Sequence, residues 1–342
     1  MTSSDSPQLF GTDGVRDLAG EGRLAPTTVT RLGRSLARFA RGRGGSHRIL
    51  LARDPRPSGP DLVAQLAAAM TTEGAEVVDA GVLPSPALAW LTADGDFALG
   101  CAISASHNPA SYNGIKPFLS DGTKLTIAQE LEIEAGLDAP GGQAPAGEAI
   151  KNDALGHRYV GTTRDLLVAG GELSGLRLAV DLSAGAATAT APAVLEGLGV
   201  DATYLHGADT RPINDACGTE HPEAWLEAVR AGDNDGGLAF DGDADRVLVA
   251  DETGQLLDGD DLLAILALDL LTRGGVPGDC VVGTVMANLG LQEFLAERGV
   301  VLVRAPVGDR NVAEMMRARG AILGGEPAGH IVLPRSDLPG EG

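Results

Sequence analysis

The chain has 342 residues, of which 44% are hydrophobic and 3% aromatic, and its formal net charge is −21. This length provides for two or three domains of ordinary size, and the hydrophobic content predicts buried cores and excludes a disordered chain. A chain so acidic, with so few aromatic side chains for base stacking, is not expected to bind nucleic acid or an anionic membrane surface. A phosphorylated substrate would need a site that gathers its own cations.

The three cysteines, Cys101, Cys217 and Cys280, lie far apart and show no Cys-x-x-Cys spacing. An odd number without a framework predicts reduced thiols, so we expect a cytoplasmic protein. The first residues lack the charged and apolar segments of a signal peptide. The longest apolar run, residues 262–271, is about half a membrane span and contains Asp269, so we expect a buried helix there.

The chain contains an internal repeat of α/β type. Each of the three copies begins with a strand and its loop, followed by a helix that ends at a glycine. A second and a third strand follow, each with its own loop. The glycines are Gly74, Gly199 and Gly299. The first strands lie in 48–59, 176–186 and 280–290, the second in 75–86, 200–210 and 300–310, and the third in 97–109, 236–246 and 321–330. In α/β sheets, ligands bind beyond the carboxyl ends of the strands.

The repeat predicts three successive similar α/β domains, with mixed, largely parallel sheets around a central active-site cleft. We assign residues 1–153 to domain I, 154–253 to domain II and 254–342 to domain III. Within domain I, residues 26–41 have the apolar spacing of a helix, and the Gly/Pro/Ala-rich segment 139–149 is predicted to be a surface loop.

Several arginines follow Gly-rich or polar turns, where a guanidinium and backbone N–H groups hold phosphate. For each one taken singly, a surface arginine is the favoured interpretation. They lie in GTDGVR (Arg16), RDPRPSG (Arg53 and Arg56) and VGDRN (Arg310).

The segment SASHNP, residues 104–109, follows an apolar strand, and Lys116 stands ten residues after Ser106. A plain polar turn is one interpretation. A Ser-His hydrolase is another, but the adjacent Ser106 and His107 are not expected to form the hydrogen bond of a triad, and no G-x-S-x-G elbow occurs. A serine beside a histidine, a lysine and a metal site favours phosphoryl transfer, with the serine carrying the phosphoryl group.

The segment DGDADR brings Asp241, Asp243 and Asp245 together. Three carboxylates this close repel one another unless a cation lies among them, and hard oxygen ligands favour Mg²⁺. An EF-hand is excluded because Arg246 occupies the position of its glycine and the next residues are typical of a strand. A solvated acidic turn is the remaining alternative.

The segment GGEPAGH contains Glu326 and His330. These residues are suited to recognition of a hydroxyl group, and a simple turn is an equally good interpretation.

Taken in order, FGTDGVR, ISASHNP with NGIKPF, AFDGDADRV, VGDRNV and GGEPAGH resemble the motifs of the α-D-phosphohexomutase superfamily. The resemblance covers essentially the whole chain and is greatest to the bacterial phosphoglucosamine mutase branch. The segment INDACGTEH, residues 213–221, also resembles that branch.

The resemblance implies an isomerase of amino-sugar metabolism that interconverts glucosamine 6-phosphate and glucosamine 1-phosphate through a phosphoserine and a bisphosphorylated sugar. It implies that Ser106 carries the phosphoryl group, and that a sugar bisphosphate serves as activator and intermediate. One Mg²⁺ is implied at Ser106, Asp241, Asp243 and Asp245. The resemblance also implies catalytic roles for Arg16, His107, Lys116 and Arg246, with His107 or Lys116 as acid/base, and sugar or phosphate binding by Arg310, Glu326, Gly329 and His330.

Two departures from the family pattern weaken the implied specificity and affinity. Ala328 replaces the serine of the sugar loop, which removes one hydroxyl, a loss of about 0.5–1.5 kcal/mol. The family's fourth domain, with its phosphate-gripping loop, is not found before Gly342, so we expect weak substrate affinity and poor turnover from a fragment or a truncated relative. Phosphoglucomutase or phosphomannomutase activity, or a non-catalytic phosphosugar-binding remnant, are the alternatives. The expected partner is a phosphosugar, and the expected assembly a monomer or homodimer.

Overall fold

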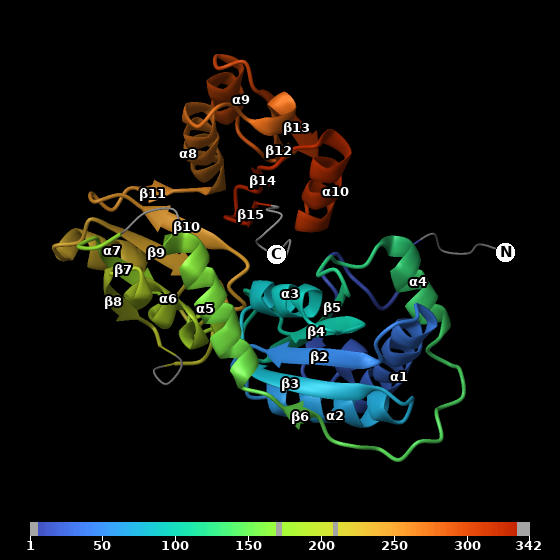
Figure 1. The fold of residues 1–342 in the computed structure, drawn as a ribbon. Helices are drawn as coiled ribbons and strands as arrows, with labels where there is room; N and C mark the ends of the chain where they lie inside the picture. The colour runs from blue at the N-terminus through green and yellow to red at the C-terminus, as the bar shows by residue number, and fades with distance from the viewer. Residues whose placement is uncertain (1–5, 169–172, 208–210, 334–342) are drawn as a thin grey trace.

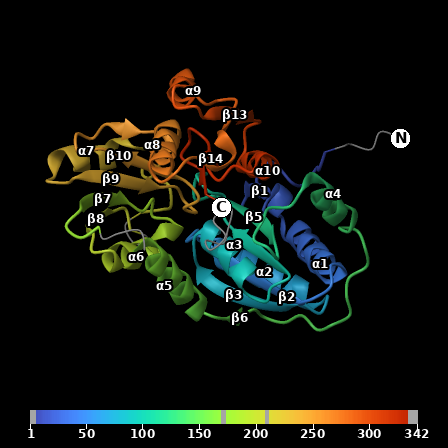
Figure 2. The same ribbon diagram turned by 45° about the horizontal axis from the view of Figure 1, so that its top comes forward.

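The computed structural model describes residues 6–168, 173–207 and 211–333, and their strands form three separate sheets (Figures 1 and 2). Each sheet forms its own lobe, and the chain passes through the three lobes in order, from blue to red in Figure 1. Among the described residues, no helix combines the length and apolar character needed to cross a membrane.

The first lobe is a sheet of order β1-β5-β4-β2-β3-β6 between two layers of helices. Helices α1 and α2 cover one face, and α3 covers the other, so the central strands are buried on both sides. A capping box at Thr126 begins α4. The elements are β1 (Val15–Leu18), α1 (Pro26–Gly42), β2 (Arg48–Arg53), α2 (Gly59–Thr71), β3 (Glu76–Val82), α3 (Ser85–Asp94), β4 (Leu99–Ile103), β5 (Tyr112–Leu119), α4 (Ile127–Ala135) and β6 (Ile150–Lys151).

The second lobe is a sheet of order β11-β10-β9-β7-β8. Two cores lie on its faces: one includes α6, and Trp225 of α7 is fully buried in the other. Helix α5 contacts α3 of the first lobe and α6 of the second. The elements are α5 (Ala154–Val168), β7 (Arg177–Asp181), α6 (Ala191–Gly197), β8 (Asp201–Leu205), α7 (Glu223–Ala231), β9 (Gly236–Phe240), β10 (Val247–Ala250) and β11 (Leu256–Leu257).

The third lobe is a smaller sheet of order β13-β12-β14-β15. Its central strand β12 is buried along its whole length. The last nine residues of the predicted domain III, including the segment SDLPGEG, lie outside the described residues. The elements are α8 (Gly259–Thr272), β12 (Cys280–Thr284), α9 (Leu289–Ala296), β13 (Val301–Ala305), α10 (Asp309–Arg319), β14 (Gly324–Gly325) and β15 (Ile331–Val332).

The predicted repeat appears as one topology used three times. In each sheet the first strand of the repeat lies between the second and the third and runs parallel to both. Gly74, Gly199 and Gly299 have φ of 86°, 76° and 74°, the left-handed conformation that closes a helix and favours glycine. The predicted fold class, three α/β domains with mixed and largely parallel sheets, is therefore confirmed.

Two details differ from the sequence-based expectation. Helix α8 was expected to be buried, but Ile265 and Leu268 are 52% and 45% exposed, because only the face with Leu263 and Ala267 packs on the third sheet. Strand β11 lies after the predicted domain boundary at residue 253, yet it pairs with β10 and extends the second sheet.

Candidate active site

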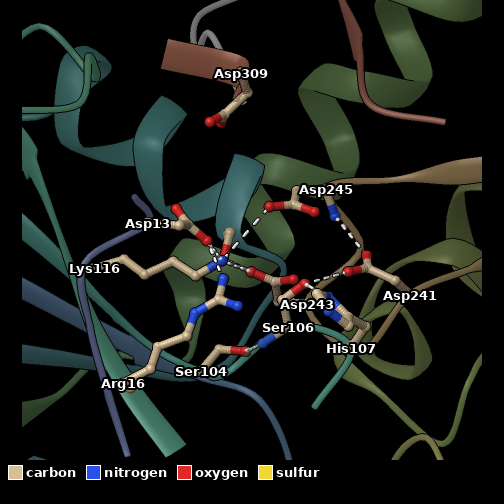
Figure 3. Close-up of polar contacts among 12 residues, drawn as sticks. Asp13, Arg16, Ser104, Ser106, His107, Lys116, Asp241, Asp243, Asp245 and Asp309 are labelled. Carbon is tan, nitrogen blue, oxygen red and sulfur yellow. Dashed lines mark hydrogen bonds and ion pairs between the residues drawn. The ribbon is translucent and has the colours of Figure 1, made fainter. Parts of the chain in front are cut away.

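The loop after β4 presents Ser106 to the junction of the lobes. The Ser106 hydroxyl donates to Asp241 Oδ2 over 2.6 Å (Figure 3). Arg246 Nη2 lies 3.0 Å from the same hydroxyl. Ser104, the other serine of the motif, is buried: its hydroxyl accepts from the Ser106 N–H and donates to Asp54. Of the two serines, only Ser106 is available for chemistry.

The neighbouring Ser106 and His107, which were not expected to form the hydrogen bond of a triad, do lie within hydrogen-bond distance of each other. His107 Nδ1 lies 3.3 Å from Ser106 Oγ, since Ser106 adopts a left-handed conformation that turns the two side chains to the same side. The short hydrogen bond of the hydroxyl nevertheless goes to Asp241, and Arg246 also contacts His107 Nδ1. Partial burial and the charge of Arg246 lower the pKa of His107.

The three aspartates follow β9 and converge. Their carboxylate oxygens lie within 4.8 Å of one another, and Asp241 and Asp243 are buried. Burial, together with the charges of Asp245 and Asp243, raises the pKa of Asp241 to about 7 against the opposing charge of Arg246. The residues after Arg246 form strand β10, as expected when the EF-hand was excluded. Because the aspartates are buried and clustered, a solvated acidic turn does not describe them.

The two carboxylate oxygens of Asp243 differ in their hydrogen-bond partners. Its Oδ2 accepts from Lys116 Nζ at 2.7 Å and from the hydroxyl of Ser85, the first residue of α3. Its Oδ1 is buried with no hydrogen-bond partner among the described residues. Burial opposes the charged form, but Lys116 and Ser85 outweigh it and lower the pKa of Asp243.

Lys116 on β5 is a buried cation among carboxylates. Its Nζ lies 2.8 Å from Asp13 Oδ2 and 3.5 Å from Asp245 Oδ2, in addition to the contact with Asp243 (Figure 3). Burial disfavours the charged amine, but the three carboxylates outweigh it and raise the pKa of Lys116. Lys116 therefore stays protonated across the neutral range.

Arg16 lies on β1, the neighbour of β5 in the first sheet, and pairs with Asp13. Its Nε is buried and makes no hydrogen bond within the described part of the chain. Arg246 contacts Asp241 at 3.1 Å and Glu220 at 3.3 Å. Arg16, Lys116 and Arg246 are therefore cations of this site that are each already beside carboxylates.

The third lobe adds Glu326 and His330. Glu326 Oε1 accepts from the N–H of Gly308 at 2.9 Å, and His330 lies 3.9 Å from Asp245 and 3.6 Å from Asp309. His330 Nε2 is buried and has no hydrogen-bond partner in the described ranges. Gly329 has φ of 91°, and a Cβ there would lie 2.3 Å from the carbonyl oxygen of Val247, so only glycine lets the third lobe approach β10 this closely.

Ser106, His107 and Arg246 are among the residues that line a cleft of about 240 Å³ between the three lobes. The buried Lys116, Asp241 and Asp243 are not among its lining residues. Arg310 is not among its lining residues: its guanidinium donates to Glu130 and to the carbonyl of Leu125, joining α10 to the first lobe. The cleft is lined by Thr12, Asp13, Arg16, Ser106, His107, Lys124, Asp245, Arg246, Val307, Gly308, Asp309, Glu326, Ala328 and His330.

Sequence reasoning did not single out Asp13, Lys124 or Asp309. Lys124 Nζ lies 2.9 Å from Asp13 Oδ1 and also contacts Asp309, and no local pattern around Lys124 indicates this. Asp13 and Asp309 lie inside GTDGVR and VGDRN, the motifs that were interpreted through their arginines. Arg56, read as a surface side chain or an anion contact, is instead fully buried, and its donors are taken up by protein oxygens.

Comparison with known proteins decides the family. Models of the three α/β/α domains of phosphoglucomutase/phosphomannomutase match residues 7–141 (domain I), 158–254 (domain II) and 258–342 (domain III). The chain belongs to the α-D-phosphohexomutase family.

The curated relatives of this phosphohexomutase include the phosphoglucosamine mutases of Symbiobacterium thermophilum, 44% identical over 345 residues, and of Moorella thermoacetica, 43% identical over 342 residues. Each match covers 98% of this chain and 76% of the relative. A solved structure of a phosphoglucomutase/phosphomannomutase family protein from Burkholderia thailandensis has a TM-score of 0.83 at 27% identity, covering 100% of this chain and 74% of that one. The predicted superfamily is confirmed, and the chain is a mutase of the isomerase class.

Phosphohexomutases generally use Mg²⁺, and the side chains of this phosphohexomutase fit such an ion. Three carboxylates that share one centre are the hard oxygen ligands that Mg²⁺ prefers. Asp243 Oδ1, buried and without a partner in the described residues, is the kind of atom that a cation would satisfy. Burial and the neighbouring Asp245 and Asp243 raise the pKa of Asp241, and a cation among the three carboxylates would oppose that effect.

Proposed function

We propose that this phosphohexomutase interconverts glucosamine 6-phosphate and glucosamine 1-phosphate, with Ser106 as the phosphoryl carrier. The supporting observation is the Ser106 hydroxyl, which reaches a cleft lined by all three lobes and contacts both Asp241 and Arg246. The glucosamine substrate is supported by relatives more than 40% identical that are phosphoglucosamine mutases.

The phosphoryl group moves from Ser106 Oγ to the oxygen of the free hydroxyl of the sugar monophosphate, so that the Oγ–P bond breaks as the new O–P bond forms. The proton that the sugar hydroxyl loses is returned to Ser106 Oγ, which becomes a hydroxyl again. The bisphosphate then turns over in the cleft, and its other phosphoryl group returns to Ser106 Oγ, so atoms and charge balance over the cycle. Asp241, Asp243 and Asp245, with a phosphoryl oxygen on Ser106, would hold Mg²⁺, whose positive charge would offset the charge of the transferred group.

The cations of the chain orient the phosphoryl group. Arg246 is positioned for this because it contacts Ser106 Oγ directly, and Arg16 has a buried Nε that hydrogen-bonds to none of the described residues. Lys116 stays charged, so it stabilises negative charge or donates a proton and does not serve as a base. His107, beside the hydroxyl and with a lowered pKa, is the candidate proton acceptor.

Sugar recognition is assigned to Glu326, Gly329 and His330. Glu326 and His330 line the same cleft as Ser106, and Gly329 lies in the turn between them. Ala328 lines the same wall without a hydroxyl, so discrimination among hexoses relies on the other side chains. Arg310, paired with Glu130, would need to leave this partner before it could bind a phosphate.

The test is a coupled assay with Mg²⁺ and a hexose 1,6-bisphosphate activator, comparing glucosamine, glucose and mannose phosphates. We expect glucosamine 6-phosphate to be the preferred substrate and Ser106→Ala to lose turnover by about 10³-fold or more. Ser111→Ala changes an exposed hydroxyl in the same loop and is the matched control, expected to keep full activity. Preference for glucose or mannose phosphate would establish the alternative mutases, and binding without turnover the phosphosugar-binding remnant. Unchanged activity of Ser106→Ala would exclude the phosphoserine.

A further inference from the structure

The backbone of Ser106 is held in an unusual conformation. Its φ of 51° lies in the left-handed region, which is unfavourable for a serine unless its surroundings compensate. This conformation brings the hydroxyl to Asp241. The groups that hold the backbone therefore decide where the hydroxyl lies.

Two donors from different lobes bridge the same two carbonyl oxygens of this loop. Arg56 Nη2 donates to Ser106 O and Asn108 O, at 2.8 Å each. Asn214 Nδ2 donates to Ser106 O at 2.8 Å and to Asn108 O at 2.9 Å. Each carbonyl thus receives one hydrogen bond from the first lobe and one from the second.

Arg56 is a fixed part of the first lobe. It is fully buried, its Nε donates to Asp54, and its Nη1 donates to the carbonyls of Pro109 and Tyr112. With the two bonds of Nη2, all five N–H donors of the guanidinium are satisfied. A phosphate group therefore finds no free donor on Arg56.

Asn214 is oriented just as firmly from the second lobe. Its Oδ1 accepts from Ser183 Oγ at 2.8 Å, so Nδ2 must face the two carbonyls. Its own N–H donates to the carbonyl of Ser183, whose N–H is in turn held by Asp181. Gly242 packs against this arrangement: a Cβ there would lie 2.4 Å from Ser106 O and 2.9 Å from the amide of Asn214.

We propose that Asn214 is a positioning residue that, together with Arg56, holds the main chain of Ser106 so that its hydroxyl faces Asp241. The proposal goes beyond the proposed function and rests on it for the meaning of that position, namely phosphoryl transfer at Ser106. Asn214 is not among the residues that line the cleft, so it acts through the loop and not on the substrate. The second lobe thus completes the serine site of the first.

The test uses two substitutions of Asn214 by residues that tolerate its φ of 61°, which lies in the left-handed region. Asn214→Asp has the same shape and keeps the bond to Ser183, but it turns a carboxylate oxygen toward two carbonyl oxygens. Asn214→Gly removes the side chain and accepts the same φ. Ala216→Gly is the matched control, because Ala216 has φ of 50° in the same segment and makes no hydrogen bond to the serine loop.

We expect both Asn214 variants to slow phosphorylation of Ser106 by a hexose 1,6-bisphosphate about tenfold or more, with Asn214→Asp the slower. The KM for the sugar monophosphate is expected to change less than about twofold, since the substrate cleft is untouched. Backbone amide exchange in residues 104–109 is expected to rise about tenfold in both variants and to stay unchanged in Ala216→Gly.

Unchanged exchange in residues 104–109 of both variants would overturn the positioning role, whatever the function of the chain. The positioning role would also be overturned if amide exchange rises in the variants while the rate of Ser106 phosphorylation stays within twofold of that of the unmodified protein. The conformation of the serine loop would then not matter for phosphoryl transfer. If the unmodified protein takes up no phosphate on Ser106 while exchange rises in the variants, the proposed function fails, and the holding of the loop by Asn214 stands.

Discussion

At the scale of single residues, Asp243 shows how neighbours prepare one carboxylate for a cation. Two donors, Lys116 and Ser85, occupy Oδ2, while Oδ1 has no partner among the residues described. The backbone N–H of Ser85 also donates to the Asp243 carbonyl, so the start of α3 fixes both ends of this residue. Side chains such as Lys116 and Ser85, which contact a metal-ligating residue and not the metal, orient that residue and tune the affinity of the site for the metal.

Ser85→Ala is therefore expected to weaken Mg²⁺ binding by about tenfold, because the carboxylate of Asp243 loses one of the two donors that orient it. Isothermal titration of Mg²⁺ into the protein measures this directly, without reference to turnover. Ser35→Ala is the matched control: Ser35 is also buried and donates one hydrogen bond, to the carbonyl of Ile133, far from the aspartates. Equal Mg²⁺ affinity in the two variants would contradict the orienting role of Ser85.

At the scale of elements, β4 shows how a central strand serves two cores. Leu99, Cys101 and Ile103 point to the core under α1 and α2, and Ala102 points to the core under α3. The strand also ends at the serine loop, so its burial fixes the position from which Ser106 projects. Burial in this setting raises the pKa of the Cys101 thiol to about 12, from an ordinary value near 9.

This shift predicts a loss of stability at alkaline pH. The unfolded thiol ionises near pH 9 whereas the folded one keeps its proton, so the unfolded state binds fewer protons and stability falls as pH rises. Between pH 9 and 11 the contribution of Cys101 is about 1.4 kcal/mol per pH unit in the free energy of unfolding. Urea unfolding at several pH values is expected to give a shallower pH slope for Cys101→Ala. The same slope in both proteins would refute the shift.

At the scale of the whole molecule, buried charge pairs join the lobes around the cleft. Lys116 connects the first lobe to Asp243 and Asp245 of the second (Figure 3). Lys124 connects Asp13 to Asp309 of the third lobe. Burial opposes each charge, but Lys116 and Lys124 outweigh it and lower the pKa of Asp13, and Lys124 lowers the pKa of Asp309. The charges of Asp13 and Asp309 in turn outweigh burial and raise the pKa of Lys124. Removing a cation from such a group leaves carboxylates buried and uncompensated.

Lys124→Met is expected to loosen the contact between the first and third lobes and to destabilise it by roughly 3 kcal/mol, because Asp13 and Asp309 lose the cation they share. Small-angle X-ray scattering should register a larger radius of gyration, and thermal unfolding an earlier transition. Lys151→Met, at an exposed lysine of β6, is the control and should match the unmodified protein. Identical scattering and unfolding for both variants would show that Lys124 does not hold the lobes together.

Much of the fold and part of the candidate site could be read from the sequence, because both depend on short local patterns. Apolar runs closed by glycine specify the strand–helix–strand units, and three acidic residues within DGDADR must lie near one another wherever the segment folds. The same local reading misjudged α8, whose apolar pattern does not reveal that Ile265 and Leu268 face outward. It also misjudged Arg56, whose acceptors lie about 50 residues further along the chain.

The threefold repeat, the family motifs and the chemical character of the serine and aspartate loops are all readable from local sequence patterns. Three features depend on how the lobes pack: Asp243 Oδ1 lacks a partner among the described residues, Lys124 bridges two lobes, and Asn214 reaches the carbonyl of Ser106 across 108 residues. The physical reason is that a hydrogen bond or ion pair depends on distances of about 3 Å. Such distances between remote segments exist only after the lobes have packed.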